Sequence, residues 1–157
     1  YKISHNIDDL NQLRNKFVAI DTEGREQYIQ RPIIIQIADE HLCVILRYDE
    51  YELEIRGFLN TKKVFVFGGA NEFRIMGFTP PRYIEVQSSN SQSLKDMASD
   101  YHCVTERFLK PNKYFYENVN WQDPSKEHII YAAFDALNTY ILGINMVNQR
   151  RSQSQKH

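Results

Sequence analysis

Acidic side chains stand at three separate places in this sequence where, brought together, they could act as metal ligands. Asp21 and Glu23 are two residues apart at the end of an apolar run that begins at Phe17. In an extended strand both side chains would project to the same side. Carboxylate oxygens suit hard cations such as Mg²⁺ or Mn²⁺. Taken alone, the pair also fits a solvated junction between a strand and a turn.

At the second place, Glu72 follows an apolar run and the pair Gly68 and Gly69. It falls near the start of an expected helix, where an acid also complements the positive end of the helix dipole. Helix capping alone would therefore explain it. The two glycines before a helix would allow a phosphate to approach, but their flanks lack the usual phosphate-loop pattern, which favours close packing instead.

The third place is on a long helix near the end of the chain. Tyr131 and Asp135 are four residues apart and so share one helix face, while Ala132, Ala133 and Ala136 keep the surrounding surface small. An Asp among apolar neighbours requires a cation or a partner, because burial disfavours its charged form. The alternative is that Asp135 faces solvent beside Tyr131.

The elements that must position these acids follow from hydrophobic pattern and turn signals. Short connections predict that the first three strands are antiparallel, after which the order becomes strand, helix, strand. We expect a mixed sheet of five strands, flanked by helices. The expected strands are Phe17–Asp21, Ile33–Ala38, Leu42–Leu46, Val64–Phe67 and Tyr83–Val86, and the first two helices cover Tyr51–Leu59 and Asn71–Met76.

Two more helices are predicted in the second half of the chain. Ser93–Asp96 has the form of a capping box. Asp123 is expected to cap a last helix with Pro124 in its first turn, and Ile129–Val147 continues it with helical periodicity. Residues 105–120 show no clear periodicity, and the polar tail 150–157 is expected to be disordered.

Length and composition predict a single domain over residues 1–149. The 157 residues suffice for one compact core, and Tyr1 in place of a starting Met suggests that the domain was excised from a longer protein. The net charge of −1 provides no global attraction to nucleic acid. Two cysteines without metal-ligand spacing and the lack of a long apolar run predict a soluble intracellular protein without a membrane partner, in the nucleus or cytoplasm.

Four segments, in this order, resemble the RNase D and Werner-type branch of the DEDD 3′-to-5′ exonucleases: VAIDTEG, VFVFGGANEFRIMGF, SLKDMA and NWQDPSKEHIIYAAFDAL. The resemblance extends from about Phe17 to about Asn148 and includes Trp121 before the last helix. It implies an α/β fold of the RNase H-like type. That branch carries Asp-x-Glu in its first motif and Tyr-x-x-x-Asp in its third. The matching residues here are Asp21, Glu23, Tyr131 and Asp135.

The chain departs from the family pattern in its second motif. Glu72 stands where the family has Asp, which keeps the charge and lengthens the side chain. Ile130 stands where the sister branch has its catalytic histidine, and Tyr131 follows it, so the chain resembles the tyrosine type of the family. Position 72 separates two interpretations, a working but slowed exonuclease and a pseudonuclease that serves as an RNA-binding or protein-interaction module.

The resemblance implies two-metal hydrolysis that releases nucleoside monophosphates from a 3′ end. Asp21, Glu23 and Asp135 would hold one Mg²⁺ or Mn²⁺ ion, Asp21 would bridge to a second, Glu72 would support that second ion, and Tyr131 would orient the attacking water. Family frequency favours single-stranded RNA over DNA, and the partners would include other domains of a longer chain or a protein complex. A stretch of aromatic and basic residues could hold the strand: Arg107, Phe108, Lys110, Lys113, Tyr114, Phe115 and Tyr116. A solvated loop with anchoring aromatics is the alternative.

Overall fold

The computed structural model describes residues 1–157 except 27–29, 88–92, 95–96, 98–117 and 156–157. The helix expected to begin at Ser93–Asp96 falls largely outside the described residues. The described elements follow the strand and helix order that the sequence predicts. They are β1 Lys2–Ser4, the 3₁₀ helix η1 Ile7–Gln12, β2 Phe17–Arg25, β3 Pro32–Ala38, β4 Leu42–Arg47, α1 Tyr48–Asn60, β5 Lys63–Val66, α2 Gly69–Met76, β6 Tyr83–Glu85 and α5 Lys126–Gln155.

The sheet is mixed, and in the described part of the chain it has six strands in the order β1-β4-β3-β2-β5-β6. β2, β3 and β4 are antiparallel neighbours, which confirms the prediction for the first three expected strands. β5 and β6 run parallel to β2, and β1 runs parallel to β4. The prediction of five strands missed β1, whose three residues have no alternating pattern of their own and pair with Leu42–Val44.

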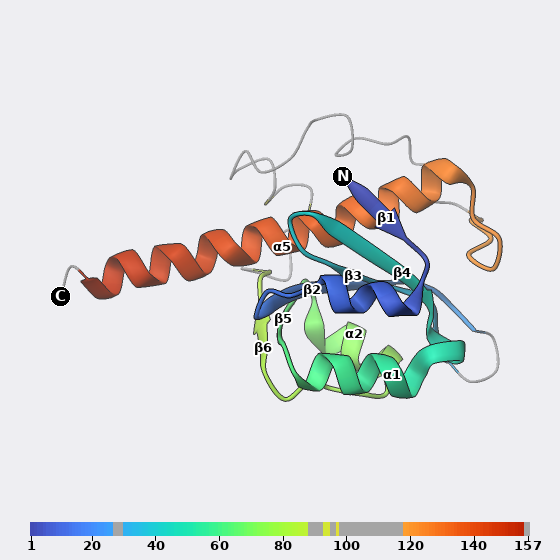
Figure 1. The fold of residues 1–157 in the computed structure, drawn as a ribbon, viewed down its shortest axis with the longest axis horizontal. Coiled ribbons are helices and arrows are strands. Elements are labelled where there is room, and N and C mark those ends of the chain that lie inside the picture. Colours follow the sequence, from blue (N-terminus) through green and yellow to red (C-terminus); the bar gives the residue numbers. More distant parts are fainter. Residues whose placement is uncertain (27–29, 88–92, 95–96, 98–117, 156–157) are drawn as a thin grey trace.

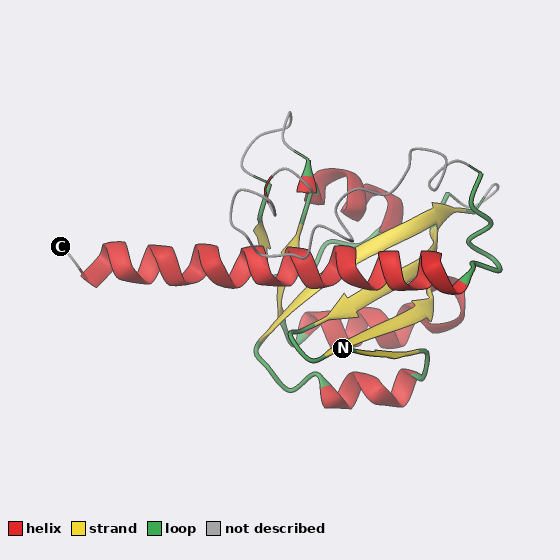
Figure 2. Ribbon diagram, turned by 90° about the horizontal axis from the view of Figure 1, so that it is seen from above, coloured by secondary structure: helices red, strands yellow, loops and turns green. Residues whose placement is uncertain are grey.

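Helices cover both faces of this sheet, as Figure 1 shows. On one face, Ile55 of α1 and Met76 of α2 are fully buried against strand residues such as Ile20 and Ile35. On the other face, α5 crosses the strands (Figure 2). Its contact with the sheet is made by two further clusters, which contain Ala133, Ala136 and Tyr140. Burial of apolar surface in both layers stabilises the fold.

Small residues let α5 approach the sheet closely. Ala133 and Ala136 of α5 are fully buried beside Ala38 of β3. Further along the helix, a Cβ atom at Gly143 would lie 2.3 Å from the ring of Phe65, closer than any real contact. A larger residue at these points would push the helix away from the strands. The close approach is what brings the polar side chains of α5 within reach of β2.

Both ends of α5 differ from the prediction. Ser125, rather than Asp123, caps its N-terminus, because the Ser125 hydroxyl oxygen accepts the backbone N–H of His128 at 3.2 Å. Residues 150–155 were expected to be disordered, but they continue the helix to Gln155. Extending a formed helix by one polar residue costs little compared with starting a new one. Figures 1 and 2 show this C-terminal part extending beyond the sheet.

The membrane prediction can be compared with the described helices. Among them, none combines the length and the apolar character that crossing a bilayer requires. α5 reaches 30 residues, but polar residues occur throughout it and charged residues lie toward both ends and at Asp135.

Candidate metal centre

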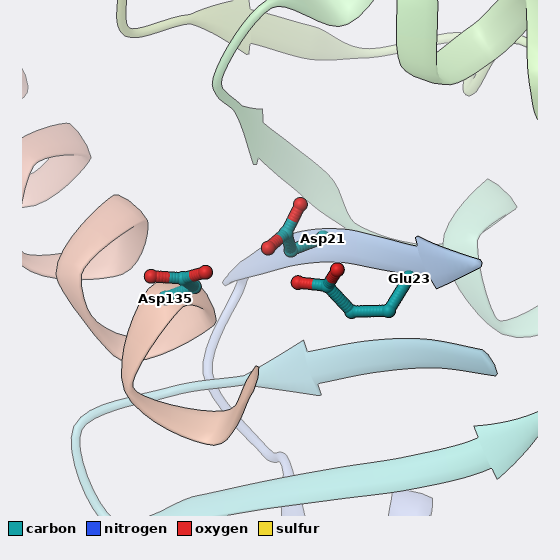
Figure 3. A group of neighbouring side chains, drawn as sticks. All are labelled: Asp21, Glu23 and Asp135. Atoms are coloured by element: carbon teal, nitrogen blue, oxygen red, sulfur yellow. The ribbon is translucent and has the colours of Figure 1, made fainter. Parts of the chain in front are cut away.

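Three carboxylates meet between the sheet and α5. Asp21 and Glu23 come from β2 and Asp135 comes from α5, and one oxygen atom of each lies within 4.8 Å of the others. Figure 3 shows the three side chains pointing toward one another from the two elements. The sequence analysis placed Asp21 and Glu23 on the same side of a strand, and the structure has them there. All three are half-buried.

Strand register explains why these acids face the helix. Asp21 pairs with Gln36, and Glu23 pairs with Ile34. Paired residues on neighbouring strands project to the same face, so this row of side chains lies on the face that α5 covers. Since Asp135 is on the inner side of α5, one turn beyond Ala132, the fold places it opposite β2. The alternative that Asp135 faces open solvent is wrong.

Electrostatic repulsion dominates the group when no cation is present. Burial raises the pKa of Glu23 to about 8, and the neighbouring carboxylates of Asp135 and Glu72 add to the effect. Burial also raises the pKa of Asp135 to about 7. The pKa of Asp21 lies well above its ordinary value, first through burial and then through repulsion by Glu23, Glu72 and Asp135. A divalent cation placed between the three oxygens would remove both the repulsion and the unfavourable burial of charge.

Tyr131 lies one turn before Asp135 on the same helix face. Its hydroxyl group donates a hydrogen bond to the Asp135 carboxylate, which lowers the pKa of that carboxyl and partly offsets the effect of burial. The predicted pair therefore acts as a unit. Tyr131 is half-buried, and its hydrogen bond keeps its hydroxyl beside the Asp135 carboxylate.

Glu72 is close to the acidic group but does not join it. Among the described residues, the set whose ligand atoms lie within 4.8 Å of one another contains only Asp21, Glu23 and Asp135. The Glu72 carboxylate instead accepts a hydrogen bond from the hydroxyl of Thr22. Burial raises the pKa of Glu72, while Thr22 and Arg25 lower it. Its charge still contributes to the raised pKa of both acids on β2, so it borders the group.

Gly68, just before α2, and Gly69, its first residue, have a structural explanation. The Glu85 carboxylate of β6 accepts the backbone N–H of Gly68 at 2.7 Å and that of Gly69 at 3.1 Å. A Cβ atom at Gly69 would lie 2.8 Å from the side chain of Val66 and 3.1 Å from that of Phe73. The Glu85 carboxylate thus satisfies the backbone N–H groups at the start of α2. Gly69 allows the backbone to pack closely against Val66 and Phe73.

Gln36 is the residue of this site that the sequence analysis missed. Its side chain is fully buried, and its Nε2 donates to the Ala132 carbonyl at 3.1 Å and faces the Asp21 carboxylate at 3.5 Å. It also lowers the pKa of Glu23 through a hydrogen bond. One amide therefore links both acids of β2 to the backbone of α5. A signal was present in the sequence, because this polar amide interrupts the apolar run Ile33–Ala38.

Trp121 and Gly24 fix the chain beside Glu23. A Cβ atom at Gly24 would lie 3.0 Å from the Cβ of Trp121 and 2.8 Å from the Ile33 side chain, and Gly24 has a φ of 73°. Only glycine adopts this conformation readily and leaves that space. The Trp121 ring meets His128 edge-on, with the ring centroids 5.9 Å apart.

The residues from Arg107 to Tyr116 that were predicted to bind a nucleic-acid strand lie outside the described residues.

Comparison with known proteins shows the fold. No protein-family model and no curated protein matches the sequence. Among solved structures, NrnC of Brucella melitensis matches with a TM-score of 0.73 and 15% identity, covering 99% of this chain and 84% of NrnC. A second NrnC structure, with bound Mg²⁺, matches with a TM-score of 0.66.

Two further structures match with about half of their length. RNase D of Escherichia coli, described as an exoribonuclease involved in structured RNA processing, has a TM-score of 0.65 and 18% identity, over 98% of this chain and 45% of RNase D. The catalytic core of RRP6 from Trypanosoma brucei has a TM-score of 0.63 and 17% identity, over 96% of this chain and 48% of RRP6. Similarity at this level of identity establishes that the chain has the RNase H-like α/β fold.

Proposed function

We propose that this protein is a metal-dependent 3′-to-5′ exonuclease acting on single-stranded nucleic acid. The observation that carries the proposal is the convergence of Asp21, Glu23 and Asp135 from two elements far apart in sequence. Structural stability does not explain such a group, since half-buried carboxylates that repel one another destabilise a fold. The match of these positions to the motifs of the DEDD exonucleases supports the same conclusion. The fold shared with RNase D, an exoribonuclease, adds to it.

The donor set fits Mg²⁺ or Mn²⁺, which prefer oxygen ligands, and the Mg²⁺-bound structure of NrnC supports divalent metal use on this fold. When bound, two such ions supply an activated water and stabilise the departing oxygen of a phosphodiester. Asp21, Glu23 and Asp135 would hold one ion, with Asp21 bridging to the other. Tyr131, fixed by Asp135, would hold the water that attacks the phosphorus, and nucleoside monophosphates would be released.

Glu72 would support the second ion, and its contact with Thr22 makes that support weak. The carboxylate is engaged with a neighbouring hydroxyl and lies outside the tight group. This observation favours a slowed enzyme. It also sustains a second candidate function, a pseudonuclease that binds RNA or a partner protein without cutting. Trimming activity distinguishes the two.

RNA is the proposed substrate, in preference to DNA. Support comes from RNase D and from the frequency of RNA substrates among exonucleases that the motifs resemble. One NrnC structure contains bound pGG, so a short nucleic acid can bind to a protein of this fold. Nothing in the described site addresses a 2′-hydroxyl, which would distinguish the two sugars.

The test is digestion of single strands labelled at one end. A 5′-labelled RNA should shorten into a ladder in Mg²⁺ or Mn²⁺, a 3′-labelled RNA should lose its label in the first step, and EDTA should stop both. The same digestion of labelled single-stranded DNA measures the preference for ribose over deoxyribose. Binding of the RNA without any trimming in Mn²⁺ would reject the exonuclease and favour the pseudonuclease.

Metal affinity should depend on pH because the acids hold protons in the metal-free protein. The raised pKa values of Asp135, about 7, and Glu23, about 8, mean that a cation must displace protons below these values. We expect Mn²⁺ affinity to increase about tenfold or more per pH unit from pH 6 to pH 7, and less steeply above pH 8. Calorimetric titration in buffers of different ionisation enthalpy measures the released protons. A Mn²⁺ affinity that does not change between pH 6 and pH 8 would contradict the assignment of these residues as metal ligands.

Gln36 should act as a positioning residue for the acids. Gln36→Leu removes the donor that links Asp21 and Glu23 to the Ala132 carbonyl, and we expect Mn²⁺ affinity to fall by about tenfold, as for other residues that orient metal ligands. Tyr48→Phe is the matched control, because the buried Tyr48 hydroxyl also donates to a backbone carbonyl, that of Met76 at 2.9 Å. It should lose stability without losing Mn²⁺ affinity. Equal affinity losses in both variants would show a merely structural role for Gln36.

A further inference from the structure

Four basic side chains gather at the end of the sheet where β2, β5 and β6 begin: Lys16, Lys63, Arg82 and Arg151, here called the basic patch. Lys63 opens β5, and Lys16 and Arg82 immediately precede β2 and β6. Within the described part of the chain, none of the four makes an ion pair with an acid. The chain as a whole has a net charge of −1, so this positive charge is local.

Strand register holds three members of the basic patch together. The Lys63 N–H donates to the Lys16 carbonyl at 2.9 Å, and the Val64 N–H donates to the Arg82 carbonyl at 3.0 Å. A cation therefore lies at, or directly before, the first residue of each of three neighbouring parallel strands. This closeness is unfavourable without an anion, since like charges repel at short range.

Arg151 joins these residues from the C-terminal part of α5, which extends beyond the sheet (Figure 1). Its guanidinium group is close enough to act on the Lys63 ammonium group. The ammonium group of Lys16 lowers the pKa of Lys63 most, and Arg82 and Arg151 lower it further. The helical segment 150–155 thus completes the basic patch.

The aromatic ring of Phe17, beside the basic patch, is not available for stacking on a nucleic-acid base. Phe17 stacks on Phe65 with ring centroids 5.0 Å apart and planes inclined by 1°. The Nζ atoms of Lys16 and Lys63 lie over the Phe17 ring, 5.8 and 5.9 Å from its centroid. Cation–π attraction holds both ammonium groups there. The Phe17 ring is therefore covered on both sides, and the charges around it suit recognition of phosphates regardless of base.

The basic patch lies at the start of β2, whereas the acidic group lies in the middle and second half of this strand. Phe17 and Asp21 are four residues apart on this strand, a distance of about 13 Å. Both side chains are on the face that α5 covers. A nucleic-acid strand whose 3′ end is at the acidic group is itself a polyanion, so phosphates further along it that pass around α5 to the start of β2 would meet the four cations.

We propose that the basic patch binds the phosphate backbone of a nucleic-acid strand, upstream of the 3′ end held at the acidic group. The inference rests on the proposed exonuclease function for the identity of the strand. It predicts contacts that are independent of sequence and sensitive to salt. It also predicts that strands too short to reach the basic patch gain nothing from it.

Binding in EDTA tests this proposal separately from cleavage. The patch variant combines Lys16→Gln, Lys63→Gln and Arg151→Gln, and the control variant combines Lys2→Gln, Arg74→Gln and Lys126→Gln, three exposed cations elsewhere. Fluorescence anisotropy would follow a labelled single-stranded RNA of about twenty nucleotides over a range of NaCl concentrations. The patch variant should bind at least about tenfold more weakly at low salt, and its slope of log affinity against log salt should fall by about 2, since each phosphate contact in a single strand contributes about 0.7.

The control variant should bind within about twofold of the unmodified protein, and trimming of a dinucleotide should be the same in all three proteins. Equal weakening in patch and control variants would overturn the proposal, as would an unchanged slope in the patch variant. Tighter binding of an oligoglutamate of equal charge than of the RNA would assign the basic patch to an acidic protein instead. If the unmodified protein binds RNA through the basic patch but never trims it, the exonuclease function is rejected, whereas the role of the basic patch in RNA binding is supported.

Discussion

Asp21→Asn should reduce the trimming rate at least about a thousandfold, equivalent to about 4 kcal/mol of transition-state stabilisation. Burial and three neighbouring carboxylates all act on Asp21 and raise its pKa. The proposed mechanism also gives it contacts to both ions. An amide in its place keeps the shape and removes the charge, so the loss reports on metal binding. Initial rates on a 5′-labelled RNA in Mn²⁺ measure it.

The same substitution should stabilise the metal-free protein. The pKa of Asp21 is raised in the folded state, so the folded protein retains a proton that the unfolded chain releases, and ionisation of Asp21 costs stability as pH rises. Asp21→Asn should therefore raise the melting temperature in EDTA at pH 8, and less so at pH 5. Exposed Asp123, changed to Asn, is the matched control and should alter neither rate nor stability. A variant that loses activity and stability together would indicate a structural role for Asp21.

Glu72→Asp should increase the trimming rate about tenfold, whereas Glu72→Gln should lower it by about a hundredfold. The hydrogen bond from Thr22 holds the Glu72 carboxylate outside the group of three acids. The shorter Asp side chain would release Thr22 and restore the residue that the resembling exonucleases have here, and a displacement of about 1 Å at a reacting centre is worth about a hundredfold in rate. Gln removes the charge altogether. Single-turnover rates in Mn²⁺ separate this effect from RNA binding.

Thr22→Val provides the check on this explanation. It removes the hydroxyl group that engages Glu72 and leaves the shape of the side chain nearly unchanged. If the Thr22 contact restrains Glu72, the variant should also trim faster than the unmodified protein. A slower Thr22→Val and a slower Glu72→Asp would together show that the longer acid is already well placed.

Much of the fold is predictable because the pattern of the chain is strong where packing is dense. The β-branched run of β3 and the apolar run at the start of β2 identify both strands, and small residues on α5 indicate its close approach to them. β1 could not be predicted in this way, since three residues acquire strand structure only by pairing with Leu42–Val44. The cap of α5 was misplaced because Asp123 and Ser125 are both good caps, and the choice depends on the path of the chain around Trp121.

The candidate site was predictable in its members more than in its geometry. Spacing alone placed Asp21 with Glu23 and Tyr131 with Asp135, but only the fold brings β2 and α5 together. The contact between Glu72 and Thr22 depends on side-chain conformation, which no spacing rule reveals. Gln36 was missed because a single polar residue in a strand has many explanations until its partners are known.

The central claim is that Asp21, Glu23 and Asp135 form a divalent-cation site. The most direct measurement is anomalous X-ray scattering from a crystal of this protein grown at about pH 8 and soaked in Mn²⁺, with Asp135→Asn treated identically. The account predicts a peak between the three carboxylates in the unmodified protein and a much weaker one in the variant. No peak at this position, or an equal peak in both proteins, would contradict it.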